Sequence, residues 1–246
     1  LLVIYMNLEE ILEKVKKSEI INDSIGTKQE KTIHKVLKFY LADDAKYHEI
    51  KIDNYFIDVY KDGMIYEIQT KSFNAIKNKL SNLLINHEVT IVYPLTIEKH
   101  IYIEDDNGEL LRKRKSPKTG SPLIICSELY KIKSLLKSNN LHLMIVLLKT
   151  KERRFLRINR YHRTVSSRID ELPFEITSKL DFKTVAELSD LLPNTLPTEF
   201  TTNDLVKNLK LRKKDASLVA NILYSTGALE RTGKVRNCYL YKKHIY

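Results

Sequence analysis

The chain has few cysteines and no long apolar run. Its two cysteines, Cys126 and Cys238, stand far apart among 246 residues, so neither a disulfide framework nor the ligand spacing of a zinc site is present. This cysteine usage favours a reducing cytoplasm. No apolar run approaches the about 20 residues of a membrane-spanning helix, so the sequence predicts no membrane partner.

Acidic residues are also in short supply. The sequence has 31 Asp and Glu against 42 Lys and Arg, which gives a net charge of +11 and an isoelectric point near 9.4. Such a charge favours a polyanionic partner, most often nucleic acid, although a generally Lys-rich proteome would give the same balance. The hydrophobic fraction of 43% is enough for a core, and the length suits one large domain or two smaller ones.

A tight β-hairpin is predicted around Asp62-Gly63. This pair is a strong signal for a two-residue turn, because both central positions of a type I′ turn require a positive φ. With this pair as the turn, Asp58 lies directly opposite Glu67. Side chains alternate between the two faces of a strand, so Gln69 and Lys71 share the face of these carboxylates.

Two facing carboxylates require an explanation. Directly paired Cβ atoms are only about 5 Å apart, and like charges at that distance destabilise a sheet. A divalent cation is the simplest explanation, since hard cations take oxygen ligands. The alternative is a solvated hairpin face, but Phe56 and Tyr60 share the side of Asp58 and indicate partial burial. The pattern therefore favours a Mg²⁺ or Mn²⁺ site.

The hairpin lies within a predicted run of helix, three strands, helix and strand. Periodicity places these elements at 27–40, 47–52, 55–60, 64–71, 73–86 and 89–93, with Pro94 ending the last strand. Beyond this run we expect a helix at 7–17, a hairpin at 97–114 turning at 106–108, a helix at 124–137 and a strand at 141–149. The connections predict an α/β protein with a mixed sheet.

The C-terminal residues follow a different pattern. A Pro- and Thr-rich connector precedes two expected helices, one capped by Thr201 or Thr202 and one ending before Gly227. A helix at 184–192 and a hairpin turning at 232–234 complete the order of a winged helix-turn-helix. We therefore expect two domains, at residues 1–180 and 181–246.

Residues 27–95 resemble the core of the PD-(D/E)XK nuclease superfamily, the restriction-endonuclease-like fold. The resemblance rests on the α-β-β-β-α-β order, on Asp58, and on Glu67-Ile68-Gln69 in the position of the Glu-x-Lys motif. The pieces 66–73 and 92–95 also resemble an uncharacterised prokaryotic group that combines this core with a C-terminal winged helix. The resemblance implies metal-dependent cleavage of DNA.

The resemblance also implies roles for single residues. Asp58 and Glu67 would hold the metal together with the Ile68 carbonyl, because backbone oxygens suit Mg²⁺. Glu30 matches the acidic residue often found on the first helix of the family. Such a metal acts as a Lewis acid and lowers the pKa of its bound water, which meets both needs of phosphodiester hydrolysis.

Gln69 departs from the family pattern, which has a lysine there. An amide can orient a water but cannot supply a positive charge. Lys71 lies one step further along the same face, and its long side chain could reach a phosphate. Two interpretations stay open: a working nuclease with a relocated or missing lysine, and a domain that binds DNA without cutting it.

Several basic residues are candidate DNA contacts, since Lys and Arg neutralise backbone phosphates. Residues of the expected recognition helix and wing could also read bases. The candidates are Arg112, Lys113, Arg114, Lys115, Lys118, Arg212, Lys213, Lys214, Ser217, Asn221, Lys234 and Arg236. A solvated loop, or a winged helix used for protein contact, would explain the same residues.

Taken together, the sequence predicts a cytoplasmic, Mg²⁺- or Mn²⁺-dependent deoxyribonuclease acting on double-stranded DNA, with a homodimer as one arrangement for cutting both strands. Two other classes remain open. One is a DNA-binding regulator built on an inactive nuclease scaffold, and the other is a structural protein whose positive charge is only general.

Overall fold

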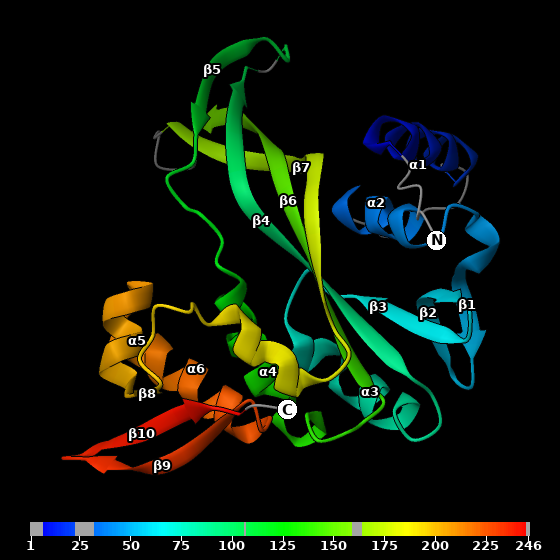
Figure 1. Cartoon of the computed structure of the whole chain (residues 1–246). Helices are drawn as coiled ribbons and strands as arrows, with labels where there is room; N and C mark the ends of the chain where they lie inside the picture. Colours follow the sequence, from blue (N-terminus) through cyan, green and yellow to red (C-terminus); the bar gives the residue numbers. More distant parts are fainter. Residues whose placement is uncertain (1–6, 23–31, 106, 159–163, 245–246) are drawn as a thin grey trace. The chain divides into compact units, whose positions relative to one another are not determined.

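The computed structural model describes residues 7–22, 32–105, 107–158 and 164–244 (Figure 1). These residues form a mixed α/β protein with a large mixed sheet, which confirms the predicted class. Within them, a seven-stranded sheet has the order β1-β2-β3-β4-β6-β7, with β5 paired to β4, and a three-stranded sheet has the order β8-β10-β9.

Helices and strands are mixed along the chain. The α-helices are α1 (Leu8–Asn22), α2 (Thr32–Leu41), α3 (Lys77–Leu83), α4 (Ile125–Leu129), α5 (Thr202–Leu209) and α6 (Lys213–Ser225). The strands are β1 (His48–Ile52), β2 (Tyr55–Lys61), β3 (Met64–Ile68), β4 (Val89–Glu104), β5 (Leu110–Lys115), β6 (Leu141–Ile158), β7 (Thr164–Phe182), β8 (Glu199–Phe200), β9 (Leu229–Val235) and β10 (Cys238–Lys243). The 3₁₀ turns are η1 (Ala45–Tyr47), η2 (Phe73–Ile76), η3 (Pro122–Ile124), η4 (Tyr130–Leu135) and η5 (Val185–Leu191).

The chain divides into two compact units. The first unit contains residues 1–70, 94–121 and 145–180, and the second contains 71–93, 122–144 and 181–246. One boundary falls at the predicted division between residues 180 and 181, but two earlier segments also belong to the second unit. Strands β4 and β6 pass from one unit into the other, so each unit is described by itself below.

In the first unit, α1 and α2 pack against each other through an apolar face. Ile11 and Val15 of α1 meet Val36 and Phe39 of α2 in one buried cluster. The two helices lie side by side in Figure 1. Their apolar residues recur at helical spacing, as the sequence predicts.

The β2–β3 hairpin is confirmed in turn type and register. Asp62 and Gly63 have φ values of 52° and 81°, as a type I′ turn requires. The ladder pairs Lys61 with Met64 and Val59 with Tyr66, the register expected from the turn. The order of helix, three strands, helix and strand is likewise confirmed by α2, β1, β2, β3, α3 and β4.

The second unit is built around buried residues of α3, α4 and α6. Leu80, Leu129, Ile222 and Leu223 are fully buried in it. Thr201 and Asp204 form a reciprocal capping box at the start of α5, in which the Asp204 carboxylate accepts from the backbone N–H of Thr201 at 2.8 Å. The predicted cap is therefore confirmed, and its bonds satisfy donors that a helix start leaves without partners.

The end of one predicted strand and the position of one predicted turn differ from the structure. Pro94 does not end its strand, because β4 runs from Val89 to Glu104 straight through it. A strand tolerates proline where the ladder does not need its missing N–H. The C-terminal hairpin turns at Arg236, which has φ 53°, and not at 232–234, since Val235 pairs with Cys238.

Several predicted elements differ in length or type. The helix expected at 124–137 is α4 followed by the 3₁₀ turn η4, with a kink at Ile132. The helix expected at 184–192 is the 3₁₀ turn η5. Strand β6 continues to Ile158, well past the expected end at residue 149, and the long strand β7 begins at Thr164.

Candidate metal and nucleic-acid sites

Asp58 ends the paired part of the β2–β3 hairpin. Beyond Val59 and Tyr66 the ladder stops, and the backbone N–H of Ile68 donates to Asp58 Oδ2 at 2.7 Å. In a continued ladder this N–H would face Ile57. The Asp58 carboxylate therefore takes the position of a ladder acceptor, and it is held at the point where the two strands part.

Glu67 would be the next partner of Asp58 if the ladder continued past Val59 and Tyr66, and it is buried, with a residue exposure of 3%. The Asp58 side chain is 22% exposed. Burying a carboxylate is costly unless it is hydrogen-bonded, paired with a cation or bound to a metal. The two carboxylates thus lie in a partly buried setting, as the sequence predicts, and not on a fully solvated hairpin face.

His34 joins the carboxylates from α2. Its Nε2 lies 3.3 Å from Asp58 Oδ2, and its side chain is 19% exposed. Imidazole commonly serves as a proton carrier or as a metal ligand. The sequence gives only one hint of this contact, the place of His34 beside the apolar face of the helix, because its distance from Asp58 along the chain hides the pairing.

The other predicted members of the carboxylate site are placed less directly. Gln69 follows β3 at once and is half-buried, and Ile68 is buried at the end of the strand. Lys71 is exposed and belongs to the second unit. Glu30 lies outside the described residues. Among the described residues, no group of three His, Cys, Asp or Glu side chains is arranged to hold a metal ion.

The oxygen atoms of Asp58, Glu67 and Ile68 are of the ligand type that Mg²⁺ prefers. Mg²⁺ keeps several of its waters and is usually bound through one or two carboxylates. Asp58 and Glu67 supply that number, and the backbone carbonyl of Ile68 adds a hard oxygen from the same hairpin. Soft ligands are not part of the set, since Cys126 is buried in the second unit and burial raises the pKa of its thiol to about 12.

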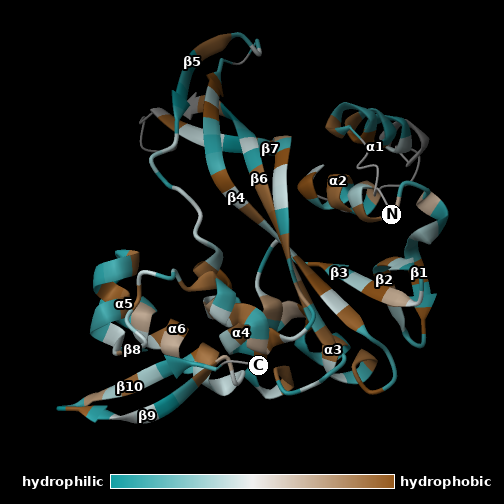
Figure 2. Ribbon diagram, viewed as in Figure 1, coloured by the Kyte–Doolittle hydropathy of each residue, from teal (hydrophilic) through white to brown (hydrophobic). Residues whose placement is uncertain are grey.

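The basic run predicted to bind DNA is largely the exposed strand β5. All six residues from Leu110 to Lys115 are exposed, and Figure 2 shows the strand brown at its start and teal beyond. Lys115 is engaged by Glu98 at 2.6 Å. Lys118 lies beyond the strand in an exposed turn. The run therefore combines one paired lysine with other exposed basic side chains.

The residues expected on the recognition helix fall on and around α6. Lys213, Lys214 and Ser217 are exposed near its start. Arg212 forms an ion pair with Asp215 at 2.6 Å, which neutralises part of its charge. Asn221 is half-buried, and its Oδ1 accepts from Lys133 Nζ at 2.9 Å, so this predicted base reader already has a partner within the second unit.

The C-terminal hairpin carries an aromatic cluster that sequence reasoning missed. The Arg231 guanidinium lies 4.0 Å from the ring centroid of Tyr224 and 3.8 Å from that of Tyr239. Lys234 lies 4.7 Å from the Tyr239 ring, in the strand and not at the turn, whereas Arg236 occupies the turn. The register of β9 and β10 and the packing of α6 beside β9 bring these side chains together.

A buried ion network crosses the first unit on β4, β6 and β7. Lys99 Nζ lies 2.8 Å from Glu152 and 2.9 Å from Glu171, and both carboxylates are buried. Thr150 donates to Glu171 at 2.7 Å, and Arg168 pairs with it at 2.8 Å. The network is compact and well hydrogen-bonded, so it stabilises these strands and competes poorly as a ligand site.

Comparison with known proteins places the chain in a family. Residues 31–183 match the model of a domain of unknown function, DUF8091. The chain belongs to this family. It is also similar to an "Uncharacterized protein" of Treponema pallidum (strain Nichols), with 30% identity over 190 residues, covering 75% of this chain and 74% of the relative. No solved structure matches the chain.

The matched segment runs from α2 to β7, and so contains His34, Asp58, Glu67 and the exposed strand β5. The family description names no activity, ligand or cofactor. None of the described helices is long and apolar enough to cross a membrane.

Proposed function

We propose that this protein is a metal-dependent deoxyribonuclease that hydrolyses phosphodiester bonds with Mg²⁺ or Mn²⁺ at Asp58 and Glu67. The observation that carries the proposal is the hairpin register, in which Val59 pairs with Tyr66, so that Asp58 and the buried Glu67 would be the next opposite residues. Facing carboxylates repel each other, and a divalent cation between them offsets that repulsion.

Two further observations support the proposal. The order of α2, β1, β2, β3, α3 and β4 is that of a restriction-endonuclease-like core, with the two carboxylates on its second and third strands. In the second unit, α5, α6 and the β9–β10 hairpin follow the order of a winged helix, whose exposed lysines at the start of α6 suit phosphate contact.

The residues of the site have distinct parts in this proposal. Asp58 and Glu67 hold the metal, which when bound polarises the phosphate and lowers the pKa of a water. The Ile68 amide and His34 orient the Asp58 carboxylate from two sides, at 2.7 and 3.3 Å. Gln69 orients a water through its amide.

The test is cleavage of supercoiled plasmid by the full chain. We expect nicking with Mg²⁺ or Mn²⁺ and none with EDTA. Asp58→Asn and Glu67→Gln keep the side-chain shape but remove the charge that holds the cation, so each should lower the cleavage rate at least about a hundredfold, the scale of a lost catalytic group. Retention of DNA binding by both variants would separate catalysis from binding.

A matched control comes from the same hairpin. Asp62→Asn removes an acid from the turn, and Asn also tolerates the positive φ found there. This variant should cleave at the wild-type rate. Undiminished cleavage by Asp58→Asn and Glu67→Gln would sink the proposal.

A second candidate is DNA binding without cleavage. Gln69 stands where the PD-(D/E)XK pattern has lysine, and the described residues hold no three-ligand metal group. This candidate predicts salt-sensitive DNA binding that is the same in EDTA and in Mn²⁺, with no nicked product in either.

A further inference from the structure

The side chains around Tyr102 form a second candidate site in the first unit. Tyr102 lies on β4, where it pairs directly with Lys113 of β5, and Lys151 belongs to β6 on the other side of β4. The ammonium of Lys113 lies 5.2 Å from the Tyr102 ring centroid, and that of Lys151 lies 4.2 Å from it. We refer to Lys113, Tyr102 and Lys151 as the Tyr102 cluster.

The nearby acidic side chains are already engaged by other cations. Glu98 contacts Lys115 at 2.6 Å and His100 at 2.9 Å, and these hydrogen bonds hold the pKa of Glu98 at about 2. Glu104 forms an ion pair with Arg153 at 2.6 Å. Glu98 and Glu104 therefore carry their own counter-charges.

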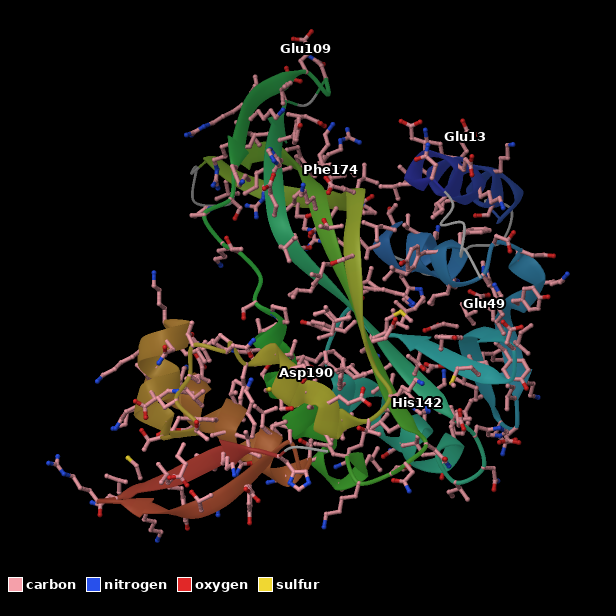
Figure 3. The ribbon with its side chains drawn as sticks, in the orientation of Figure 1. Glu13, Glu49, Glu109, His142, Phe174 and Asp190 are labelled. Atoms are coloured by element: carbon pink, nitrogen blue, oxygen red, sulfur yellow. The ribbon has the colours of Figure 1, made fainter. Side chains whose placement is uncertain are left out.

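Further along the sheet, another carboxylate is likewise paired with a lysine. Glu175 of β7 accepts from Lys149 at 2.8 Å. The ring of His100 meets Phe174, labelled in Figure 3, edge to face at 5.6 Å. Within the described residues, no carboxylate forms an ion pair with Lys113 or Lys151, and Glu104 is already paired with Arg153, whose hydrogen bonds lower the pKa of Glu104 with help from the nearby charge of Lys151.

The cation–π contacts with Tyr102 only partly stabilise the two positive charges of Lys113 and Lys151. An exposed ammonium gains little from one ring, and the two ammonium groups, each near the same centroid, repel each other. An anion placed between or beside them removes that repulsion. On the opposite face of the exposed strand β5, Arg112 and Arg114 add two more basic side chains.

We propose that the Tyr102 cluster binds the phosphate backbone of DNA. The inference rests on the proposed function, because it takes the substrate of the Asp58–Glu67 site as the ligand. Charge complementarity supports this occupant: the chain carries a net charge of +11, and four of the six residues of β5 are basic. The ring keeps two ammonium groups within 5.2 Å of one point on the sheet, and of the two side chains Lys113 is exposed and Lys151 half-buried.

The experiment measures binding of a labelled DNA duplex to the full chain in EDTA, at several salt concentrations, by fluorescence anisotropy. The double variant Lys113→Gln/Lys151→Gln should bind about tenfold more weakly at moderate salt. The slope of log K against log salt should fall by about 1.8, since each lost phosphate contact removes about 0.9. Tyr102→Leu should also weaken binding, whereas Tyr102→Phe should not.

A control separates a specific surface from general charge. Lys51→Gln removes one exposed charge from β1. It should change affinity less than Lys113→Gln or Lys151→Gln alone. Equal losses for all three single variants, wild-type affinity of the double variant, or no DNA binding by the wild type would each overturn the proposal.

Failure of this inference can be told from failure of the nuclease proposal. Binding in EDTA does not require metal-dependent cleavage, so a weak-binding double variant together with no cleavage by the wild type would support the Tyr102 cluster and reject the nuclease. Normal binding by the double variant together with cleavage lost in Glu67→Gln would support the nuclease and reject the Tyr102 cluster. Thermal unfolding of each variant confirms that it is folded.

Discussion

Replacing Lys99 with Met should destabilise the protein strongly at neutral pH. Lys99 bridges Glu152 and Glu171 at 2.8 and 2.9 Å, and the side chains of these two acids are only 4% and 6% exposed. Methionine fills a similar volume but leaves both carboxylates without this partner. Removing one partner of a buried ion pair costs about 3–5 kcal/mol. We expect about 3 kcal/mol, the lower end, because Arg154 and Arg168 still contact the two acids.

The loss should depend on pH in a defined direction. Burial raises the pKa of Glu152 and Glu171, but the hydrogen bonds from Lys99 and their other partners outweigh burial and leave both pKa values below the ordinary glutamate value. A lowered carboxyl pKa stabilises the fold above the unfolded pKa, about 4.3, and this stabilisation is lost as the pH falls through the folded pKa. In Lys99→Met the hydrogen bonds from Lys99 are lost while burial still raises the pKa of Glu152 and Glu171, so both acids protonate at a higher pH than in the wild type.

The assay is chemical denaturation of wild type and Lys99→Met at neutral pH and at about pH 4, near the unfolded glutamate pKa. The difference in the free energy of unfolding should be large at neutral pH and smaller at the acidic pH. Lys115→Met serves as the control, since its side chain is 63% exposed in its pair with Glu98. The reasoning is refuted if Lys99→Met costs no more than the control, or if its cost is the same at both pH values.

Two further predictions concern the second unit. Thr201→Ala should lower the free energy of unfolding by about 1 kcal/mol, because it removes the cap of α5, while Thr201→Ser should retain most of the stability in denaturant titrations. Arg231→Lys should lower it by about 1 kcal/mol, because lysine keeps the charge but cannot stack its guanidinium plane on Tyr224 and Tyr239; an unchanged unfolding midpoint would show that the stacking contributes nothing.

Local signals predicted much of the fold. The positive φ demanded by Asp62-Gly63 fixed the hairpin register, and the apolar spacing of α2 and α6 located both helices. Elements that depend on neighbours were harder. Pro94 stands inside β4 because tertiary pairing tolerates a missing N–H there, and Ile132 interrupts a helix that periodicity alone would continue.

The carboxylate site was predictable only in its local part. Asp58 and Glu67 are nine residues apart and one turn fixes their pairing, whereas His34 reaches Asp58 from a separate helix. The same holds for the Tyr102 cluster, whose residues come from three strands. No pattern in a single stretch of sequence encodes which of these distant side chains meet.

The sequence by itself determined the composition, the positive charge, and the turn with its register from Lys61–Met64 to Val59–Tyr66, because the turn and register follow from short-range geometry. Only the tertiary structure decided which charges are balanced. It paired Lys115 with Glu98 and Asn221 with Lys133, and it left Lys113 and Lys151 against one tyrosine ring. Charge balance depends on distances between strands and helices, and packing of the whole chain sets those distances.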